Sequence, residues 1–282
     1  MKLILQSLNA EPGAIEHIST LAGAHAIDIS DAGRHAWRCD NVTLSDAQKT
    51  QLDTACLNAG VDYALHPSHL KLSDFKLLAM DMDSTLITIE CIDEIADMQG
   101  LKPQVAAITE AAMRGELEFN ESLTRRVALL KGLDASALQR VYDERLQLSL
   151  GAQPMLAAIK AAGIKTLLVS GGFTFFTDRI KAKLGLDYAH SNVLEIVDGK
   201  LTGKVVGGIV NADEKRNTVE RVCTELGIAP SQAIVMGDGA NDLNMMKIAG
   251  LSVAFRAKPV VRAQAGVALN FVGLDGILPI LA

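Results

Sequence analysis

The chain has 282 residues, of which 49% are hydrophobic and 21% are charged, and its net charge is −6 at pH 7. This composition is typical of a globular protein that forms one large domain, or a core domain with a smaller one. The negative charge argues against a nucleic-acid surface, which would need a basic stripe. No apolar run reaches the length of about 18 residues that spans a membrane. The four cysteines have neither disulfide nor zinc spacing, so we expect a cytoplasmic chain with reduced thiols and no membrane partner.

Residues 1–70 have the pattern of a separate small domain. The predicted elements run strand, helix, strand, strand, helix and strand, at residues 1–7, 12–22, 26–30, 35–42, 44–59 and 61–66. Ser45 is the expected N-cap of the second helix, because Gln48 completes the capping-box spacing. This order is that of ferredoxin-like modules, and it resembles the small ACT-type regulatory domains of amino-acid enzymes.

From residue 71 to the end, strands and helices alternate, as they do in a parallel sheet with crossover helices. Apolar strands are predicted at residues 75–80, 165–169, 233–236 and 251–255. A helix at 154–162 precedes the second of them. Residues 194–197 and 200–206 flank Asp198-Gly199, a pair that favours a type I′ hairpin turn. We therefore expect an α/β domain with a Rossmann-like parallel sheet over residues 71–282.

The segment from about residue 92 to 150 interrupts this alternation. It is charged and helical in pattern, with helices predicted at 92–99, 103–114, 119–131 and 134–148. Because it follows the strand at 75–80, we expect an inserted helical cap over the carboxyl end of the sheet.

Two carboxylates follow that first strand of the sheet. Asp81 and Asp83 stand two positions apart, so on an extended backbone they face the same way. Ligands bind at this end of an open α/β sheet, and two neighbouring acids there need a cation or a shared proton to relieve their repulsion. A nucleophilic carboxylate beside a metal and a second acid predicts phosphoryl transfer through an aspartyl-phosphate.

A second acidic pair, Asp238 and Asp242, follows the strand at 233–236. If both strands lie in one sheet, four carboxylates meet at one edge, which indicates a hard divalent cation such as Mg²⁺. The alternative is a Gly-Asp-Gly turn with a helix-opening acid.

Two further features indicate an anion site. Ser170-Gly171-Gly172 follows the strand at 165–169 and is predicted to open a helix at Phe173, where a hydroxyl and free N–H groups bind anions. A serine N-cap with permissive glycines fits the same pattern. Lys215 lies near a predicted helix start, against the helix dipole. It therefore has either an anionic partner or a solvated charge.

These four pieces, in this order, resemble the haloacid dehalogenase-like phosphatases over residues 76–282. That family carries D-x-D-x-T, then a Ser or Thr at a strand end, then a Lys, then G-D-x-x-x-D. The resemblance implies that Asp81 is the nucleophile and that Asp83 is first the general acid and then the base for the hydrolytic water. It also implies Mg²⁺ on the Asp81 carboxylate, the backbone carbonyl of Asp83, and Asp238.

The same resemblance assigns the remaining motif residues. Ser170, the N–H of Gly171 and Lys215 would hold the transferring phosphoryl group, and Asn241 would lie at the substrate. Thr85 would fix the nucleophile loop, and Asp242 would position a metal-bound water or Lys215.

The predicted helix at 119–131 carries an arginine on its apolar side. Phe119, Leu123, Val127 and Leu130 share one face. Arg126 lies within that arc. A guanidinium there needs an anion and matches a carboxylate bidentately, in a ligand or in a structural ion pair.

The resemblance extends through Glu90-Cys-Ile-Asp-Glu-Ile-Ala into this cap and implies O-phospho-L-serine as the substrate. Arg126 would bind its carboxylate and Glu90 its ammonium, and Met113 and Phe119 would close the lid. Glu90 could instead be a helix-start acid. For residues 1–70, serine binding, a homodimer interface or neither role stays open.

One rival function is a phosphatase or phosphotransferase of the same fold that acts on another phospho-amino acid, such as phosphohomoserine. A second is a receiver protein whose Asp81 is modified without turnover. Asp83 argues against the receiver, which needs no acid for a leaving alkoxide. Cysteine-phosphatase and histidine chemistry are disfavoured, because no cysteine has an arginine six positions later and no histidine lies in the motifs.

Overall fold

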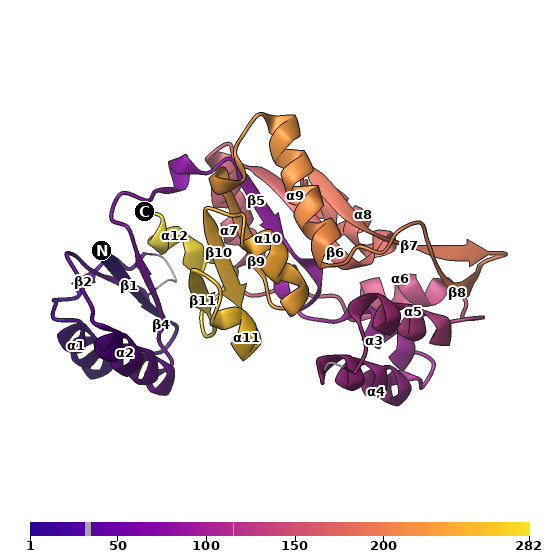
Figure 1. The fold of residues 1–282 in the computed structure, drawn as a ribbon, viewed down its shortest axis with the longest axis horizontal. Helices are drawn as coiled ribbons and strands as arrows, with labels where there is room; N and C mark the ends of the chain where they lie inside the picture. The colour runs from indigo at the N-terminus through magenta and orange to yellow at the C-terminus, as the bar shows by residue number, and fades with distance from the viewer. Residues whose placement is uncertain (32–34, 115) are drawn as a thin grey trace.

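The computed structural model describes residues 1–31, 35–114 and 116–282, except for the side chain of Met113. Figure 1 shows an N-terminal sheet with two helices, a central sheet covered by helices, and a group of helices beside one end of that sheet. The described helices include none that is long and apolar enough to cross a bilayer.

The N-terminal unit is a four-stranded antiparallel sheet with two helices on one face. Its elements are β1 (Lys2–Ser7), α1 (Pro12–Leu21), β2 (Ile27–Asp28), β3 (His35–Cys39), α2 (Asp46–Ala59) and β4 (Asp62–His66), and the strand order is β2-β3-β1-β4. The predicted element order is confirmed. So is the capping box of α2, in which Gln48 N donates to Ser45 Oγ at 3.3 Å and Ser45 N donates to Gln48 Oε1 at 3.0 Å.

The central sheet has seven strands, and the predicted α/β class is confirmed. They are β5 (Leu77–Met80), β6 (Lys165–Phe173), β7 (Tyr188–Val197), β8 (Lys200–Val206), β9 (Ala233–Gly237), β10 (Leu251–Phe255) and β11 (Val267–Leu269), in the order β11-β10-β9-β5-β6-β7-β8. Only β8 is antiparallel to its neighbour, through the predicted hairpin. The topological switch point lies between β5 and β9, where a ligand site is expected in such a sheet.

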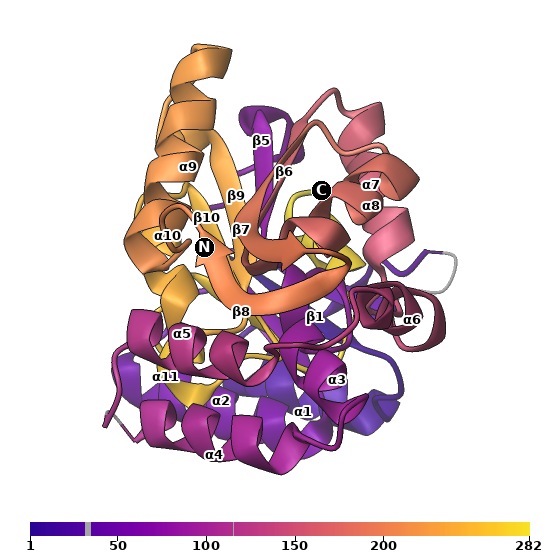
Figure 2. The same ribbon diagram turned by 90° about the vertical axis from the view of Figure 1, so that its right-hand side faces the viewer.

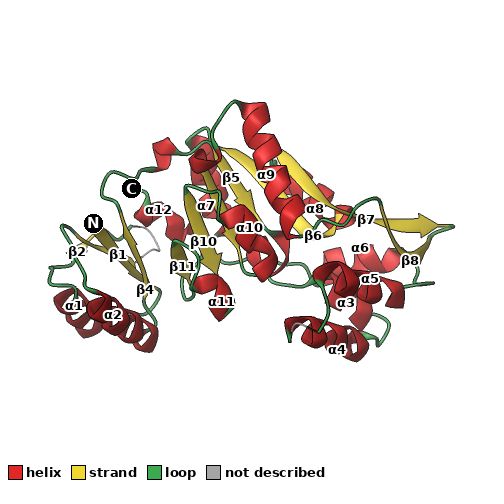
Figure 3. Ribbon diagram, in the orientation of Figure 1, coloured by secondary structure: helices red, strands yellow, loops and turns green. Residues whose placement is uncertain are grey.

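Helices cover both faces of this sheet (Figure 3). One face carries α9 (Ala212–Leu226), α10 (Leu243–Met246) and α11 (Pro259–Arg262), and the other carries α7 (Ala152–Ala161), α8 (Thr174–Leu184) and α12 (Ile277–Ile280). Along β5, Leu77 and Ala79 pack in the core on the side of α9, α10 and α11. Leu78 and Met80 pack in the core on the side of α7, α8 and α12. Because β5 is buried on both faces, burial of each large apolar side chain contributes about 1.5–3 kcal/mol, which holds the strand that delivers Asp81.

Four helices lie between β5 and α7: α3 (Cys91–Asp97), α4 (Lys102–Met113), α5 (Phe119–Leu129) and α6 (Ser136–Glu144). The segments that lead into and out of this group pair with each other. Ile87 forms an antiparallel bridge with Leu148, and Thr88 N donates to Gln147 O at 3.0 Å. In Figure 2, α5 lies directly beneath β8, so the hairpin and the helical group support each other.

The helix predicted after Ser170-Gly171-Gly172 is present one residue later than expected, but the serine N-cap alternative is wrong. The three residues belong to β6, and α8 begins at Thr174 with Phe173 as its N-cap residue. Strand β6 bulges after Val169 and resumes pairing with β7 where Phe173 lies opposite Asn192. This resumed pairing keeps the backbone of the segment extended.

A buried carboxylate is among the groups that link the N-terminal unit to the rest of the chain. Asp62, at the start of β4, accepts the backbone N–H groups of Asn270, Phe271 and Val272 at 2.8–2.9 Å. It also accepts the side-chain amide of Asn270 at 3.2 Å.

Replacing Asp62 by alanine should lower the free energy of unfolding by about 2–4 kcal/mol, because several donors lose their acceptor at a buried contact. Glu16→Ala removes an exposed carboxylate on α1 and should cost no more than about 0.5 kcal/mol. Urea unfolding of both variants checks this, and equal stabilities would contradict it.

Candidate active site

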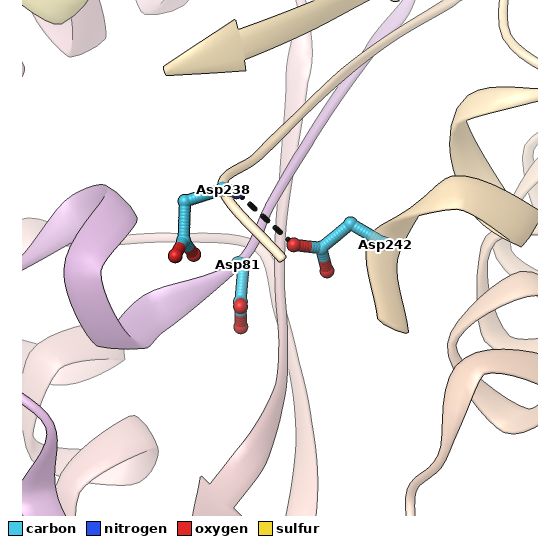
Figure 4. A group of neighbouring side chains, drawn as sticks. All are labelled: Asp81, Asp238 and Asp242. Carbon is cyan, nitrogen blue, oxygen red and sulfur yellow. Dashed lines mark hydrogen bonds between the residues drawn. The ribbon is translucent and has the colours of Figure 1, made fainter. Parts of the chain in front are cut away.

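The predicted acids meet at the switch point of the central sheet (Figure 4). Asp81 follows β5 and Asp238 follows β9, and these strands are parallel neighbours. Asp242 lies one turn beyond Asp238 and accepts the N–H groups of Asp238 and Gly239 at 3.1 and 3.0 Å. The two acidic pairs that the sequence separates by about 150 residues therefore share one edge, as their positions after strands predicted.

The loop that follows Asp81 is a single tight turn over residues 82–86. Met82 N donates to Asp81 Oδ1 at 2.7 Å, and the buried Thr85 hydroxyl donates to Asp238 Oδ1 at 3.2 Å. Ser84 has a φ of 55°, in the left-handed region that few residues other than glycine adopt. Thr85 thus ties this loop to the one after β9.

Asp83 turns from the loop toward Gly172. Its Oδ1 accepts the N–H of Cys91 at 3.0 Å, and a Cβ built on Gly172 would lie 2.6 Å from its Oδ2. Only glycine leaves room for this carboxyl group. Burial raises the pKa of Asp83, which favours the protonated form that a general acid needs.

Lys215 is fully buried beneath these acids, so the solvated-charge interpretation is wrong. Asn211 caps α9 by accepting the N–H groups of residues 213 and 214, and this places Lys215 in the first turn. Its Nζ lies 2.9 Å from Asp81 Oδ1 and 2.7 Å from Asp242 Oδ1. Burial disfavours the ammonium, but Asp242 and Asp81 outweigh that effect and raise the pKa of Lys215.

The charges in this cluster fit a divalent cation. Carboxylate oxygens of Asp81, Asp238 and Asp242 lie within 4.8 Å of one another. Burial, then the charge of Asp242, raises the pKa of Asp238 to about 6, and burial raises that of Asp81 well above its usual value. With Asp83, four carboxyl groups lie near the ammonium of Lys215, and a hard cation would relieve the excess negative charge.

A small pocket of about 60 Å³ opens beside Asp81. Its lining, from the sheet edge and the helical group, includes Asp81, Asp83, Phe119, Arg126, Ser170, Gly171 and Asn241. A larger cavity, of about 420 Å³ between the N-terminal unit and β11, contains none of these residues. Of the predicted residues, Ser170, Gly171, Asn241, Phe119 and Arg126 therefore share one space with Asp81 and Asp83, whereas Lys215 and Glu90 are not part of its lining.

Arg126 enters this pocket from α5, on the half-buried side that the helical periodicity predicted. Leu123, Val127 and Leu130 are buried, whereas Arg125 points to solvent and pairs with Glu121. Burial lowers the pKa of Arg126. Among the described residues, no carboxylate lies within 4.0 Å of its guanidinium, so Arg126 has no direct ion pair there, although the charges of Asp93 and Glu90 act on it.

Glu90 lies at the rim, near Asp83 and still in contact with solvent. It accepts the Ser84 hydroxyl at 2.7 Å, and partial desolvation, then the charge of Asp83, raises its pKa to about 8. The tip of the Phe119 ring packs against Gly171, so the cap touches the sheet across the pocket. Met113 ends α4, but its side chain lies outside the described residues.

The groups that hold these side chains were not predicted from the sequence. Ser84 binds Glu90, and the Cys91 N–H binds Asp83. Both lie within the predicted motifs, but their contacts depend on the left-handed turn at Ser84. No residue pattern in the chain signals that turn.

Comparison with known proteins agrees with this geometry. The family model of the haloacid dehalogenase-like hydrolases matches residues 75–250, and the chain belongs to this family. A curated phosphoserine phosphatase from Polaromonas sp. is 61% identical over 217 residues, which cover 75% of this chain and 92% of the relative. With its other curated relatives, this similarity places the chain in the phosphoserine phosphatase branch of the family.

Two solved structures show the same fold. A haloacid dehalogenase family hydrolase from Salmonella enterica serovar Typhi has a TM-score of 0.89 at 36% identity, covering 99% of this chain and 98% of its own. A substrate-bound phosphoserine phosphatase has a TM-score of 0.70 at 39% identity, covering 74% of this chain and 99% of its own. The first includes the N-terminal unit, and the second does not extend over the whole chain.

Proposed function

We propose that the chain hydrolyses O-phospho-L-serine to L-serine and phosphate, with Mg²⁺ as its cofactor, as the last step of serine biosynthesis. The observation that carries this proposal is Arg126, a half-buried guanidinium that shares a pocket with Asp81 and Ser170 and has no carboxylate of the described residues within 4.0 Å. A cation in that position suits a substrate with a carboxylate a few ångströms from its phosphate.

Asp81 attacks phosphorus, so that a carboxylate oxygen gains the phosphoryl group and the bond to the serine oxygen breaks. Asp83 gives its proton to that oxygen. A water then attacks the aspartyl-phosphate while Asp83 takes up its proton, and the bond to Asp81 breaks to release phosphate. The Asp83 carboxyl group, whose pKa is raised, therefore acts twice: first as the acid and then as the base.

The transferring oxygens would be held by the Ser170 hydroxyl, the Gly171 N–H and Lys215. These donors are fixed before substrate arrives, since Ser170 and Lys215 are fully buried, and such donors stabilise charge that develops in the transition state. Asn241 lines the same pocket and would contact the substrate.

Mg²⁺ would be held by the Asp81 carboxylate, the backbone carbonyl of Asp83, and Asp238. When bound, it would neutralise charge on the nucleophile and the phosphoryl oxygens. Thr85 would fix Asp238, and Asp242, hydrogen-bonded to Lys215 at 2.7 Å, would position that lysine.

Removal of the metal should abolish hydrolysis of O-phospho-L-serine, and added Mg²⁺ should restore it. Asp238→Asn should raise the Mg²⁺ concentration for half-maximal activity by about tenfold or more, since it removes one ligand. Steady-state phosphate release in chelator, with Mg²⁺ titrated back, measures both effects. Full activity in excess chelator would contradict the assignment.

In the pocket, Arg126 would bind the substrate carboxylate and Glu90 its ammonium, with Phe119 and Met113 closing over it. Comparing phospho-L-serine with phosphohomoserine tests this pairing, because one extra methylene moves the phosphate relative to both charges. Phosphate release over many turnovers also distinguishes an enzyme from a receiver. In a receiver, Asp81 would be phosphorylated once and no phosphate would be released.

We further propose that residues 1–70 form a ferredoxin-like domain of the ACT type. The phosphatase domain would span 71–282, with its cap inserted at about 92–150. The strand order β2-β3-β1-β4 and the two helices on one face support this division. Sedimentation velocity would show whether the chain forms the homodimer that such a domain allows.

A further inference from the structure

Asn192 is a buried polar side chain in the middle of β7, and it does not line the pocket. Only 1% of its surface is exposed. Its amide nitrogen donates to Gly171 O at 2.7 Å, and its amide oxygen accepts Val210 N–H at 2.9 Å. One side chain therefore joins the loop that carries Ser170 to the loop that leads into α9 and Lys215.

The bond to Gly171 replaces a missing sheet contact. β6 bulges out of register with β7 between Val169 and Phe173, so the Gly171 carbonyl lies where the ladder is interrupted. A buried carbonyl without a partner costs about 1–3 kcal/mol. Asn192 lies opposite Phe173, at the point where pairing resumes, and its side chain supplies the donor.

This contact fixes one peptide group from both ends. The carbonyl of Gly171 and the N–H of Gly172 belong to the same planar peptide. Asn192 holds the carbonyl, and the N–H donates to Ser170 Oγ at 2.8 Å. Because Ser170 Oγ already accepts that hydrogen, its own O–H is left to donate elsewhere, and the pocket lies beside it.

We propose that Asn192 is a positioning residue for phosphoryl transfer. It holds the Gly171–Gly172 peptide so that the Ser170 hydroxyl and the Gly171 N–H both donate into the pocket. Through Val210, it also keeps the loop before Lys215 in register with them. The inference rests on the proposed function, since it gives these donors a phosphoryl group to bind.

The test compares Asn192→Ala and Asn192→Asp with the wild-type enzyme. The aspartate keeps the volume of the side chain and the acceptor for Val210, but it places an oxygen against Gly171 O. We expect both variants to lower kcat for O-phospho-L-serine about 10- to 100-fold, somewhat less than the loss of a whole oxyanion donor. Inhibition by inorganic phosphate should weaken about tenfold or more, whereas product inhibition by L-serine should stay within about twofold.

Two comparisons separate positioning from a merely structural role. In the double variant with Ser170→Ala, the loss should be clearly smaller than the product of the two single losses, because Asn192 acts in part through the Ser170 hydroxyl. Ser191→Ala removes the neighbouring buried hydrogen bond to Thr177, 2.8 Å long. It should lower stability but leave the ratio of phosphate to serine inhibition unchanged.

Amide hydrogen exchange tests the geometry without any substrate. The N–H groups of Gly172 and Val210 should exchange faster in Asn192→Ala than in the wild-type chain. This expectation does not depend on which phosphate ester is the substrate. The inference is overturned if phosphate and serine inhibition weaken equally, if the losses of Asn192→Ala and Ser170→Ala multiply, or if kcat is unchanged. Wild-type protein that does not hydrolyse O-phospho-L-serine would instead refute the proposed function.

Discussion

Asp81→Asn should lower turnover of O-phospho-L-serine by at least about 10⁴-fold, the scale on which loss of a covalent nucleophile is felt. Asparagine has nearly the same shape, so β5 and the pocket stay intact. The substitution also removes one of four crowded carboxylates, of which Asp81 has a strongly raised pKa. The melting temperature should therefore not fall, as is common when a strained active-site charge is neutralised.

Phosphate release and a thermal melt on the same preparation measure both parts. Asp178→Asn, an exposed aspartate on α8, is the matched change and should leave turnover unaltered. If Asp81→Asn keeps more than a trace of activity, another group carries the phosphoryl transfer.

Arg126→Ala should lower kcat/KM for O-phospho-L-serine about 100-fold, corresponding to roughly 3 kcal/mol of lost charge-assisted hydrogen bonding. The same variant should change hydrolysis of p-nitrophenyl phosphate, which has no carboxylate, much less than it changes that of phosphoserine. The difference arises because a bound substrate carboxylate would be the group that Arg126 pairs with directly: among the described residues, no carboxylate lies within 4.0 Å of its guanidinium, although the charge of Asp93 acts on it from farther away.

Arg125→Ala is the control for this change. Arg125 is the next residue on α5, but it is exposed and pairs with Glu121 one turn earlier, a contact with little effect on stability. It should retain wild-type kinetics on both substrates. Equal losses on the two substrates in Arg126→Ala would mean that the arginine supports the cap and does not bind a carboxylate.

Much of the fold could be predicted because its signals are local. The strands β5, β9 and β10 are short apolar runs followed by polar residues, and strand ends in a parallel sheet meet at one edge. That rule alone predicts that Asp81 and Asp238 lie close together. The period of α5 likewise placed Arg126 on its buried side, and Asp198-Gly199 predicted the β7–β8 turn, where both residues have positive φ.

The errors and omissions are tertiary in origin. The Ser170-Gly171-Gly172 segment has helix-opening composition, but the resumed pairing of β6 with β7 at Asn192 keeps it extended. β11 has three residues and α10 to α12 have four each, too short for periodicity to register. Asn192 lies outside the predicted strand at 194–197, in a part of β7 that also contains His190 and Ser191, and its partners come from two distant loops.

The pairing of Ile87 with Leu148 has a consequence for how this enzyme could be re-engineered. The two ends of the helical insertion leave and rejoin the sheet side by side, so its two covalent junctions lie together, while its other contacts include those with the β7–β8 hairpin. A graft made at these junctions would exchange Arg126 and Phe119 and leave Asp81, Asp238 and Lys215 in place. If the proposed roles hold, such a graft would change substrate choice without changing the groups that carry the chemistry.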